Sequence, residues 1–231
     1  MSSTQKVLGI MQLDTRFPRI PGDIGNPESY DFPVNIKIVS GASVQRVVME
    51  GDPTLLLPFK KAAQELEAEG VFAITTSCGF LAPFQEAIAS AVDVPVFLSS
   101  LIQIPLAYMM TQGRIGIVTA NGASLQERHF RGAGVPDNIP LAVRGLHDKP
   151  SFAKTILEDT ETIDPQQIEK EVIEAVQELM EDCPDIGAFV FECHNLVPYA
   201  PAVVRVTNKP VFDIIGFAHW IYGTVVKRKF I

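Results

Sequence analysis

The sequence has few of the features that mark nucleic-acid-binding, membrane or secreted proteins. Lysine and arginine total 19 against 27 aspartate and glutamate residues, a formal net charge of −8, so no basic excess predicts nucleic-acid binding. No apolar run reaches the roughly 18–20 residues that cross a bilayer. The opening Met-Ser-Ser-Thr-Gln-Lys lacks the apolar core of a signal peptide. We therefore expect a cytoplasmic protein with neither a nucleic-acid nor a membrane partner.

Cysteine is also scarce. The chain has 3 cysteines in 231 residues, an odd number without the spacing of a disulfide framework, which fits a reducing compartment. No glycine-rich phosphate loop is present, so nothing predicts a pyridoxal cofactor. Cys193 and His194 are adjacent but have no second ligand pair nearby, which is not a zinc pattern. We expect no cofactor and no metal in a chain that is otherwise of ordinary globular composition.

Two of the cysteines lie at matching points of an internal repeat. Residues Ala73–Phe97 align with Ala188–Phe212 at a constant offset and without a gap, and Cys78 then falls on Cys193. The other identical pairs include Leu81 with Leu196, Pro83 with Pro198, Ala87 with Ala202 and Pro95 with Pro210. A single cysteine at a strand end is usually a packing residue. Its repetition at an equivalent position favours a functional pair instead, whereas Cys183 has no counterpart and is interpreted as incidental.

The position of each cysteine suggests its chemistry. Both follow a short apolar run and precede a proline-containing helical start, which places them at the carboxyl edge of a parallel sheet, where α/β proteins bind ligands. The N–H groups and positive dipole at a helix start favour a thiolate and can lower the pKa of a cysteine below about 8.5. The same N–H groups can bind a carboxylate. We therefore expect two reactive thiols beside an anion site.

Short apolar strands alternate with helices along the chain. The predicted strands are Val7–Leu13, Val34–Val39, Val71–Thr76, Val94–Leu98, Ile115–Thr119, Leu141–Arg144 and Ala188–Glu192, with a matching short segment at Pro210–Phe212. The predicted helices include Leu55–Glu69, Ile102–Thr111, Gln166–Met180 and Ile215–Val226. This alternation predicts an α/β fold with a parallel sheet in each half. Gly113 marks the junction, so residues 1–113 form the first half and 114–209 the second.

With the cysteines placed, the chain resembles the aspartate/glutamate racemase superfamily. The resemblance rests on Thr-Thr-Ser-Cys78-Gly-Phe, on Glu-Cys193-His-Asn-Leu-Val-Pro-Tyr and on the distance between them. It implies two pseudo-symmetric α/β half-domains with the active site in the cleft between them, and residues 210–231 returning to the first. It also implies cofactor-independent racemisation, with Cys78 and Cys193 as acid and base on opposite faces of the substrate carbon. Such a pair suits inversion of a carbon centre because each face needs its own proton-transfer group.

The same motifs imply substrate-binding roles for the neighbours of the cysteines, namely Ser77, Gly79, His194 and Asn195. The chain departs from the glutamate racemase pattern, because His194 lies directly beside Cys193 and because Phe80 replaces a polar residue. His194 either polarises Cys193, donates to a substrate carboxylate, or points to the outer surface. The apolar Phe80 weakens the expectation that glutamate is the substrate.

Further candidates come from the long loop Asp14–Asp31, since loops of this length inside a compact domain usually carry function. Arg16 or Arg19 could bind a substrate carboxylate through two parallel hydrogen bonds. Asn26 either contacts the substrate or only stabilises a turn. Thr119, at the end of the strand that opens the second half, is suitably placed for a hydrogen bond to the ligand.

The leading hypothesis is a cofactor-independent amino-acid racemase or epimerase acting on a small carboxylate-bearing substrate. One alternative is an isomerase of the maleate cis–trans type, in which a cysteine is a covalent nucleophile. Another is a non-catalytic protein that binds small acids or senses redox state. The sequence leaves open whether two chains form a homodimer.

Overall fold

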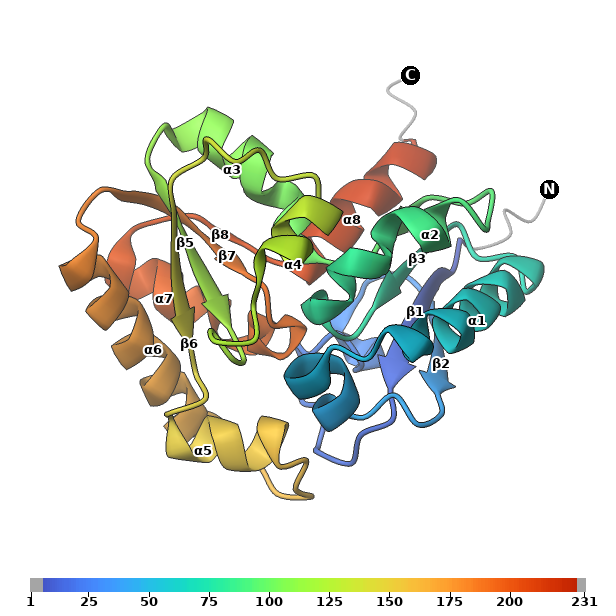
Figure 1. The fold of residues 1–231 in the computed structure, drawn as a ribbon, viewed down its shortest axis with the longest axis horizontal. Coiled ribbons are helices and arrows are strands. Elements are labelled where there is room, and N and C mark those ends of the chain that lie inside the picture. Colours follow the sequence, from blue (N-terminus) through green and yellow to red (C-terminus); the bar gives the residue numbers. More distant parts are fainter. Residues whose placement is uncertain (1–5, 228–231) are drawn as a thin grey trace.

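Residues 6–227 are described by the computed structural model, and they form two parallel β-sheets flanked by helices (Figure 1). Each sheet has four strands, in the order β2-β1-β3-β4 in the first and β6-β5-β7-β8 in the second. The strands are β1 (Leu8–Leu13), β2 (Val34–Val39), β3 (Ala73–Thr76), β4 (Val96–Phe97), β5 (Arg114–Thr119), β6 (Leu141–Gly145), β7 (Ile186–Phe191) and β8 (Val211–Phe212). The α/β fold with a parallel sheet in each half is therefore confirmed.

The helices cover these sheets. They are α1 (Leu56–Ala68), α2 (Gln85–Ala89), α3 (Ile104–Thr111), α4 (Glu127–Gly132), α5 (Pro150–Phe152), α6 (Pro165–Asp182), α7 (Ala200–Thr207) and α8 (Ile214–Val225). Short 3₁₀ segments lie at Pro27–Ser29, Pro53–Leu55, Gly79–Phe84, Ser100–Gln103 and His194–Tyr199, and π-helical turns at Gln45–Glu50 and Ala153–Leu157. Among residues 6–227, no helix is both long enough and apolar enough to span a membrane.

Helix α8 packs on the first half, although the strand before it belongs to the second half. Strand β8 still pairs with β7 in the second sheet, Phe189 opposite Val211, so the return begins after Phe212 rather than at residue 210. Helix α8 then packs on the first sheet, where Phe217 contacts Phe97 with ring centroids 5.0 Å apart. Burial of these rings holds helix α8 on the first sheet, although strand β8, which precedes it, belongs to the second sheet.

Helix α3 makes the reciprocal exchange. It follows β4 of the first sheet but packs against β5 and β7 of the second (Figure 1). By its packing, therefore, residues 104–111 belong to the second half, although the division at residue 113 assigned them to the first. Each half contributes the helix after its last strand to the other half. The two halves share one large hydrophobic core as a result, in which Ile104 of α3 is fully buried.

Both cysteines lie two residues beyond the end of a central strand. After β3 the chain continues along β1, where the Ser77 N–H donates to the Met11 carbonyl at 3.0 Å. After β7 it continues along β5 in the same way, where the Glu192 N–H donates to the Val118 carbonyl at 2.9 Å. The backbone thus delivers two equivalent thiols to the carboxyl edges of the two sheets.

Candidate active site

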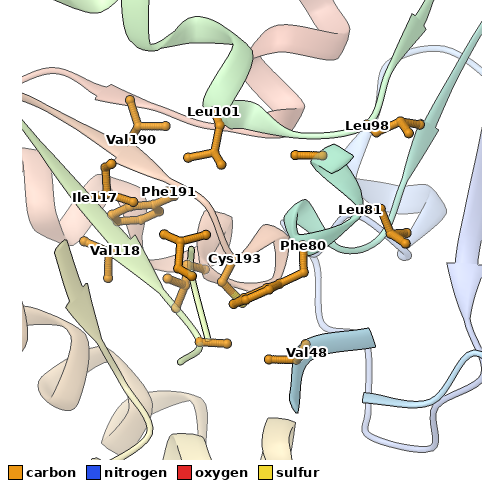
Figure 2. Packing of buried hydrophobic residues seen from close by; sticks show 14 of the residues in the cluster. Val48, Phe80, Leu81, Leu98, Leu101, Ile117, Val118, Val190, Phe191 and Cys193 are labelled. Atoms are coloured by element: carbon orange, nitrogen blue, oxygen red, sulfur yellow. The ribbon is translucent and has the colours of Figure 1, made fainter. Parts of the chain in front are cut away.

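Cys78 and Cys193 line one cavity where the two halves meet. Figure 2 shows Cys193 of the second half and Phe80 of the first pointing toward the same space. The cavity measures about 20 Å³, which is about the room that one water molecule needs. Both thiols are free rather than joined as a disulfide. Its lining residues are Leu13, Phe17, Arg19, Val44, Val48, Ser77, Cys78, Phe80, Ala120, Ile156, Cys193, His194 and Asn195.

The expectation that helix starts favour thiolates is wrong for the unliganded molecule. Burial raises the pKa of Cys78, and the nearby carboxyl group of Glu192 raises it further. Burial likewise raises the pKa of Cys193 well above its usual value. The backbone N–H groups of Phe80 and Asn195 lower these two pKa values, but less than burial raises them. The helices that start here are 3₁₀ turns of 6 residues, so their dipoles are too short to offset the loss of water.

Glu192 is a fully buried acid that the sequence analysis did not select. Its Oε2 accepts a hydrogen bond of 2.6 Å from the Thr119 hydroxyl, while Oε1 has no partner among the described residues. Burial raises the pKa of Glu192 to about 8. A Cβ at Gly79 would overlap both the carbonyl and the carboxyl oxygen of Glu192. Thr119 and Gly79 therefore contact Glu192 rather than line the cavity, which differs from their expected roles.

His194 tethers the two halves instead of acting on Cys193 or facing the outer surface. Its ring is completely buried, with Nδ1 at 2.8 Å from the Thr76 carbonyl and Nε2 accepting the Ser100 N–H at 3.3 Å. A carbonyl only accepts, so Nδ1 carries the proton. Burial lowers the pKa of His194 to about 4, which keeps the ring neutral. With both nitrogens bonded to the backbone, the ring has no free group with which to polarise a thiol or bind a carboxylate.

The first loop supplies Arg19 to the cavity rather than Arg16. The Arg16 side chain is 67% exposed and pairs with Asp159, and it is not a lining residue. Arg19 is half-buried and lies over the ring of Phe17, with its Cζ 4.4 Å from the ring centroid. Asn26 stabilises the loop, the second of its two expected roles, because its Nδ2 donates to the Arg19 carbonyl at 2.9 Å.

A buried chain of polar contacts joins this loop to the second cysteine. Arg19 Nη1 donates to Asp23 Oδ1 at 3.0 Å, and Asn195 Nδ2 donates to Asp23 Oδ2 at 2.8 Å. Asn195 Oδ1 lies 3.8 Å from the Cys193 sulfur, which donates to it. Asp23 was not selected from the sequence. The length of the loop was the only signal, since its partner Asn195 lies in the other half.

Ser77 lies in the cavity wall, and its hydroxyl oxygen accepts the Leu13 N–H at 2.9 Å. Ser77, Asn195 and His194, together with the two thiols and Arg19, form the polar part of the lining, and the remaining lining residues are apolar. Among residues 6–227, no three or more His, Cys, Asp or Glu side chains gather where they could hold a metal ion.

Solved structures define the class of this fold. The chain superposes on unliganded arylmalonate decarboxylase with a TM-score of 0.65, at 17% identity over 97% of this chain and 95% of that one. It superposes on a glutamate racemase from Bacillus anthracis with a TM-score of 0.58, at 14% identity over 95% of this chain and 81% of that one. The chain therefore has the fold of the aspartate/glutamate racemase superfamily, as its motifs predicted.

Sequence relatives identify the family to which the chain belongs. A dimethylsulfoniopropionate lyase from Durusdinium sp. clade D is 31% identical over 233 residues, which cover 96% of this chain and 76% of the relative. Dimethylsulfoniopropionate lyase 7 from Emiliania huxleyi is 34% identical over 218 residues, covering 90% of this chain and 64% of the relative. No family model matches the chain. The chain belongs to the dimethylsulfoniopropionate lyase family, whose named members are enzymes.

Proposed function

We propose that this chain is a cysteine-dependent lyase that removes the proton α to a carboxylate and eliminates dimethyl sulfide from dimethylsulfoniopropionate. The observation that carries the proposal is the pair of free thiols, Cys78 and Cys193, in one enclosed, largely apolar cavity. Relatives named for this activity align with 90% or more of the chain. This differs from the amino-acid racemase predicted from the motifs, although both reactions begin with the same proton.

The reaction balances with a single base. One thiolate takes the α-proton and becomes a thiol. The electron pair of the broken C–H bond forms the carbon–carbon double bond of acrylate, and the C–S bond breaks with its electrons leaving on neutral dimethyl sulfide. No electron acceptor is needed. Burial favours the protonated form of both thiols, but a bound sulfonium brings a positive charge beside them, which favours the thiolate.

The cavity wall suits this substrate. A sulfonium centre carries methyl groups and no N–H donor, so it needs apolar surface rather than hydrogen-bond acceptors, and the ring of Phe80 offers a face that attracts cations. An α-ammonium group would instead require several acceptors, whereas most of the lining residues are apolar. Arg19 is the cation available to the carboxylate. Its guanidinium has five N–H donors, and contacts with Asp23 and Thr15 among the described residues use two of them.

The enclosed volume adds a requirement. A space of about 20 Å³ cannot hold dimethylsulfoniopropionate, so the cavity must widen for binding and close again for chemistry. Closure would exclude water from the thiols and strengthen electrostatic interactions around the bound substrate.

Amino-acid racemisation or epimerisation is the second candidate. It is favoured by one observation, the equivalent placement of the two thiols at the ends of β3 and β7. Two proton-transfer groups on opposite sides of a carbon are what inversion needs. The cysteine-nucleophile isomerase remains a third possibility, and it alone predicts a covalent adduct on a thiol.

The test uses the purified chain with two substrate sets. With dimethylsulfoniopropionate, dimethyl sulfide is measured by headspace gas chromatography and acrylate by NMR. With a panel of amino acids in heavy water, deuterium at the α-carbon and loss of optical purity are measured. We expect dimethyl sulfide and acrylate in equal amounts. Racemisation without dimethyl sulfide would favour the second candidate, and an adduct seen by intact-protein mass spectrometry would favour the third. A chain inactive in every arm would overturn the enzymatic proposal.

A further inference from the structure

Asp23 is a buried carboxylate whose contacts converge on one side chain of the other half. Only 3% of its surface is exposed. Oδ1 accepts from Arg19 at 3.0 Å and from the Gly25 N–H at 2.8 Å, which fixes the carboxylate within its own loop. Oδ2 accepts from Asn195 Nδ2 at 2.8 Å, a contact that crosses from the first half to the second. Asp23 is not among the residues lining the thiol cavity.

The chemistry of a carboxylate decides which way the Asn195 amide faces. An ionised carboxylate accepts hydrogen bonds and donates none, so only the NH₂ end of Asn195 can face Asp23. The amide oxygen must then point the other way, and there it meets the Cys193 sulfur at 3.8 Å. An oxygen acceptor stabilises a protonated S–H, whereas an N–H donor would stabilise a thiolate.

We infer that Asp23 is a positioning residue of the active site, which holds the Asn195 amide oxygen toward Cys193 and so keeps that thiol as a proton donor. The inference rests on the proposed function only in treating Cys193 as an active-site thiol. It gives the two thiols different hydrogen-bonding surroundings, because the amide that Asp23 orients contacts only Cys193.

Several other groups act on the same thiol and must be separated from Asn195. The charges of Glu192, Cys78 and Asp23 itself all disfavour a Cys193 thiolate, and the Asn195 backbone N–H favours it. His194 is neutral and bonded elsewhere, and Tyr199 lies near enough to feel the charge of Cys193. Removing the charge of Asp23 would therefore ease ionisation even if Asn195 did not move. A double-mutant cycle is needed to isolate the part that runs through the amide.

The experiment measures the ionisation of Cys193 directly. In a Cys78→Ser/Cys183→Ser background, Cys193 is the single remaining thiol, and its alkylation rate by iodoacetamide is followed from pH 7 to pH 11.5, a range that extends well above the usual pKa of a thiol because burial raises that of Cys193. Asp23→Asn keeps the size of the side chain but lets two amides pair in either direction, so Asn195 can turn its NH₂ group to the sulfur. We expect the pH profile to move down by about one unit, which is a tenfold higher thiolate fraction at a given pH below the midpoint.

Two comparisons make the result decisive. In an Asn195→Ala background, Asp23→Asn should move the profile by much less, because the amide through which Asp23 acts is gone. An equal shift in both backgrounds would show that Asp23 acts by charge alone and would overturn the inference. A loosened loop would raise the alkylation rate at every pH without moving the midpoint, and that outcome also counts against it. Asp52→Asn, which breaks a comparable pair with Arg46 elsewhere, is the control.

This readout does not depend on turnover. A shift in Cys193 ionisation with no dimethyl sulfide release would leave the positioning role intact and reject the lyase. Release of dimethyl sulfide without a shift in Cys193 ionisation would support the lyase and reject the positioning role of Asp23. If Asp23→Asn does not fold, Asn195→Ala alone should still move the Cys193 profile relative to the parent, and an unchanged profile would overturn the inference.

Discussion

Cys78 and Cys193 occupy equivalent points of the two sheets but have different neighbours. Ser77, before the first cysteine, holds a hydroxyl against the Leu13 N–H, whereas Glu192, before the second, holds a buried carboxyl group against Thr119. The repeated backbone therefore delivers two thiols to similar places and surrounds them with different chemistry. A lyase, which needs one base, accommodates that inequality more readily than a racemase, whose two thiols must exchange roles.

The residues after the cysteines differ as well, yet they share a function. Gly79 fits against Glu192 of the second half, and His194 bonds to Thr76 and Ser100 of the first. Each cysteine is thus followed by a residue that contacts the strand end opposite. These crossed contacts, with the exchanged helices α3 and α8, set how closely the two halves approach around the cavity.

Replacing the thiols gives the largest expected effect and tests whether both are needed. Cys78→Ser removes the thiol that is left to act as the base and should lower kcat by about 10²–10⁴-fold, because a hydroxyl is a far poorer base than a thiol, whereas Cys193→Ser should cost less because the elimination needs one base. Dimethyl sulfide release is the measurement. Cys183→Ser, at the end of α6, is the matched control and should leave turnover unchanged. Near-parental activity in either active-site variant would leave that thiol without a catalytic role.

Gly79→Ala tests the closeness of the two halves. The new Cβ would overlap the Glu192 carbonyl oxygen, which is backbone and cannot rotate away, so we expect about 3 kcal/mol lower free energy of unfolding. Urea denaturation measures the change. Gly223→Ala in α8, where a Cβ meets nothing within 4 Å, should be neutral or slightly stabilising. Equal behaviour of the two variants would mean that Gly79 and Glu192 are farther apart in solution.

Glu192 and Ser77 should respond differently to pH. Because burial raises the pKa of Glu192 to about 8, the unfolded chain releases this proton at lower pH than the folded one. Stability from this group is thus complete below about pH 4.5 and is lost as pH rises toward 8. Glu192→Gln should remove that loss, gaining about 2–3 kcal/mol relative to the parent between pH 5 and pH 7.5.

Ser77→Ala is the control at the equivalent position. It removes a buried hydrogen bond, so it should lower the free energy of unfolding by about 1 kcal/mol. The loss should be the same at pH 5 and at pH 7.5, because a hydroxyl does not titrate in this range. Urea denaturation of both variants at pH 5 and pH 7.5 makes the comparison. A Glu192→Gln effect that is independent of pH would show that this carboxyl group is ionised in the folded state.

Local pattern was sufficient to predict the strands, the longer helices and the cysteine pair. Alternating apolar runs mark buried strands, and the repeat ties Cys78 to Cys193 without any knowledge of tertiary contacts. The same local reasoning failed for thiol ionisation. The helix starts, which lower a thiol pKa, are visible in the sequence. The burial that raises the pKa values of Cys78 and Cys193 by more is not.

The remaining features depend on contacts between distant segments. Asp23 meets Asn195 across 172 positions of sequence, and no local pattern announces that pairing. The choice of Arg19 over Arg16 depends on how the loop folds over Phe17. Helices α3 and α8 each pack on the sheet of the other half, and both contact strands far along the chain, such as β7 for α3. These are outcomes of packing, and a single sequence contains no period or spacing that encodes them.

His194 gives a smaller pH-dependent effect than Glu192, and its replacement separates a structural tether from a catalytic group. Burial lowers the pKa of His194 to about 4, so the unfolded chain takes up a proton near pH 6.5 that the folded chain refuses. Stability from the neutral ring is therefore present above pH 6.5 and is lost as pH falls toward 4, by about 2 kcal/mol between pH 7 and pH 5. His129, whose pKa burial also lowers to about 4, contributes a similar loss.

His194→Gln isolates the His194 share, because glutamine retains hydrogen-bonding groups and cannot titrate in this range. Urea denaturation at pH 7 and pH 5 should show that the free energy of unfolding falls by about 2 kcal/mol less than in the parent. The fall that remains should include the contribution of His129, which this variant leaves unchanged. The pH dependence of kcat should stay as in the parent, since a ring bonded to Thr76 and Ser100 exchanges no proton with the substrate. A shifted kcat profile with unchanged acid stability would instead place His194 in the chemistry, and the two strand ends would then differ in catalytic role as well as in surroundings.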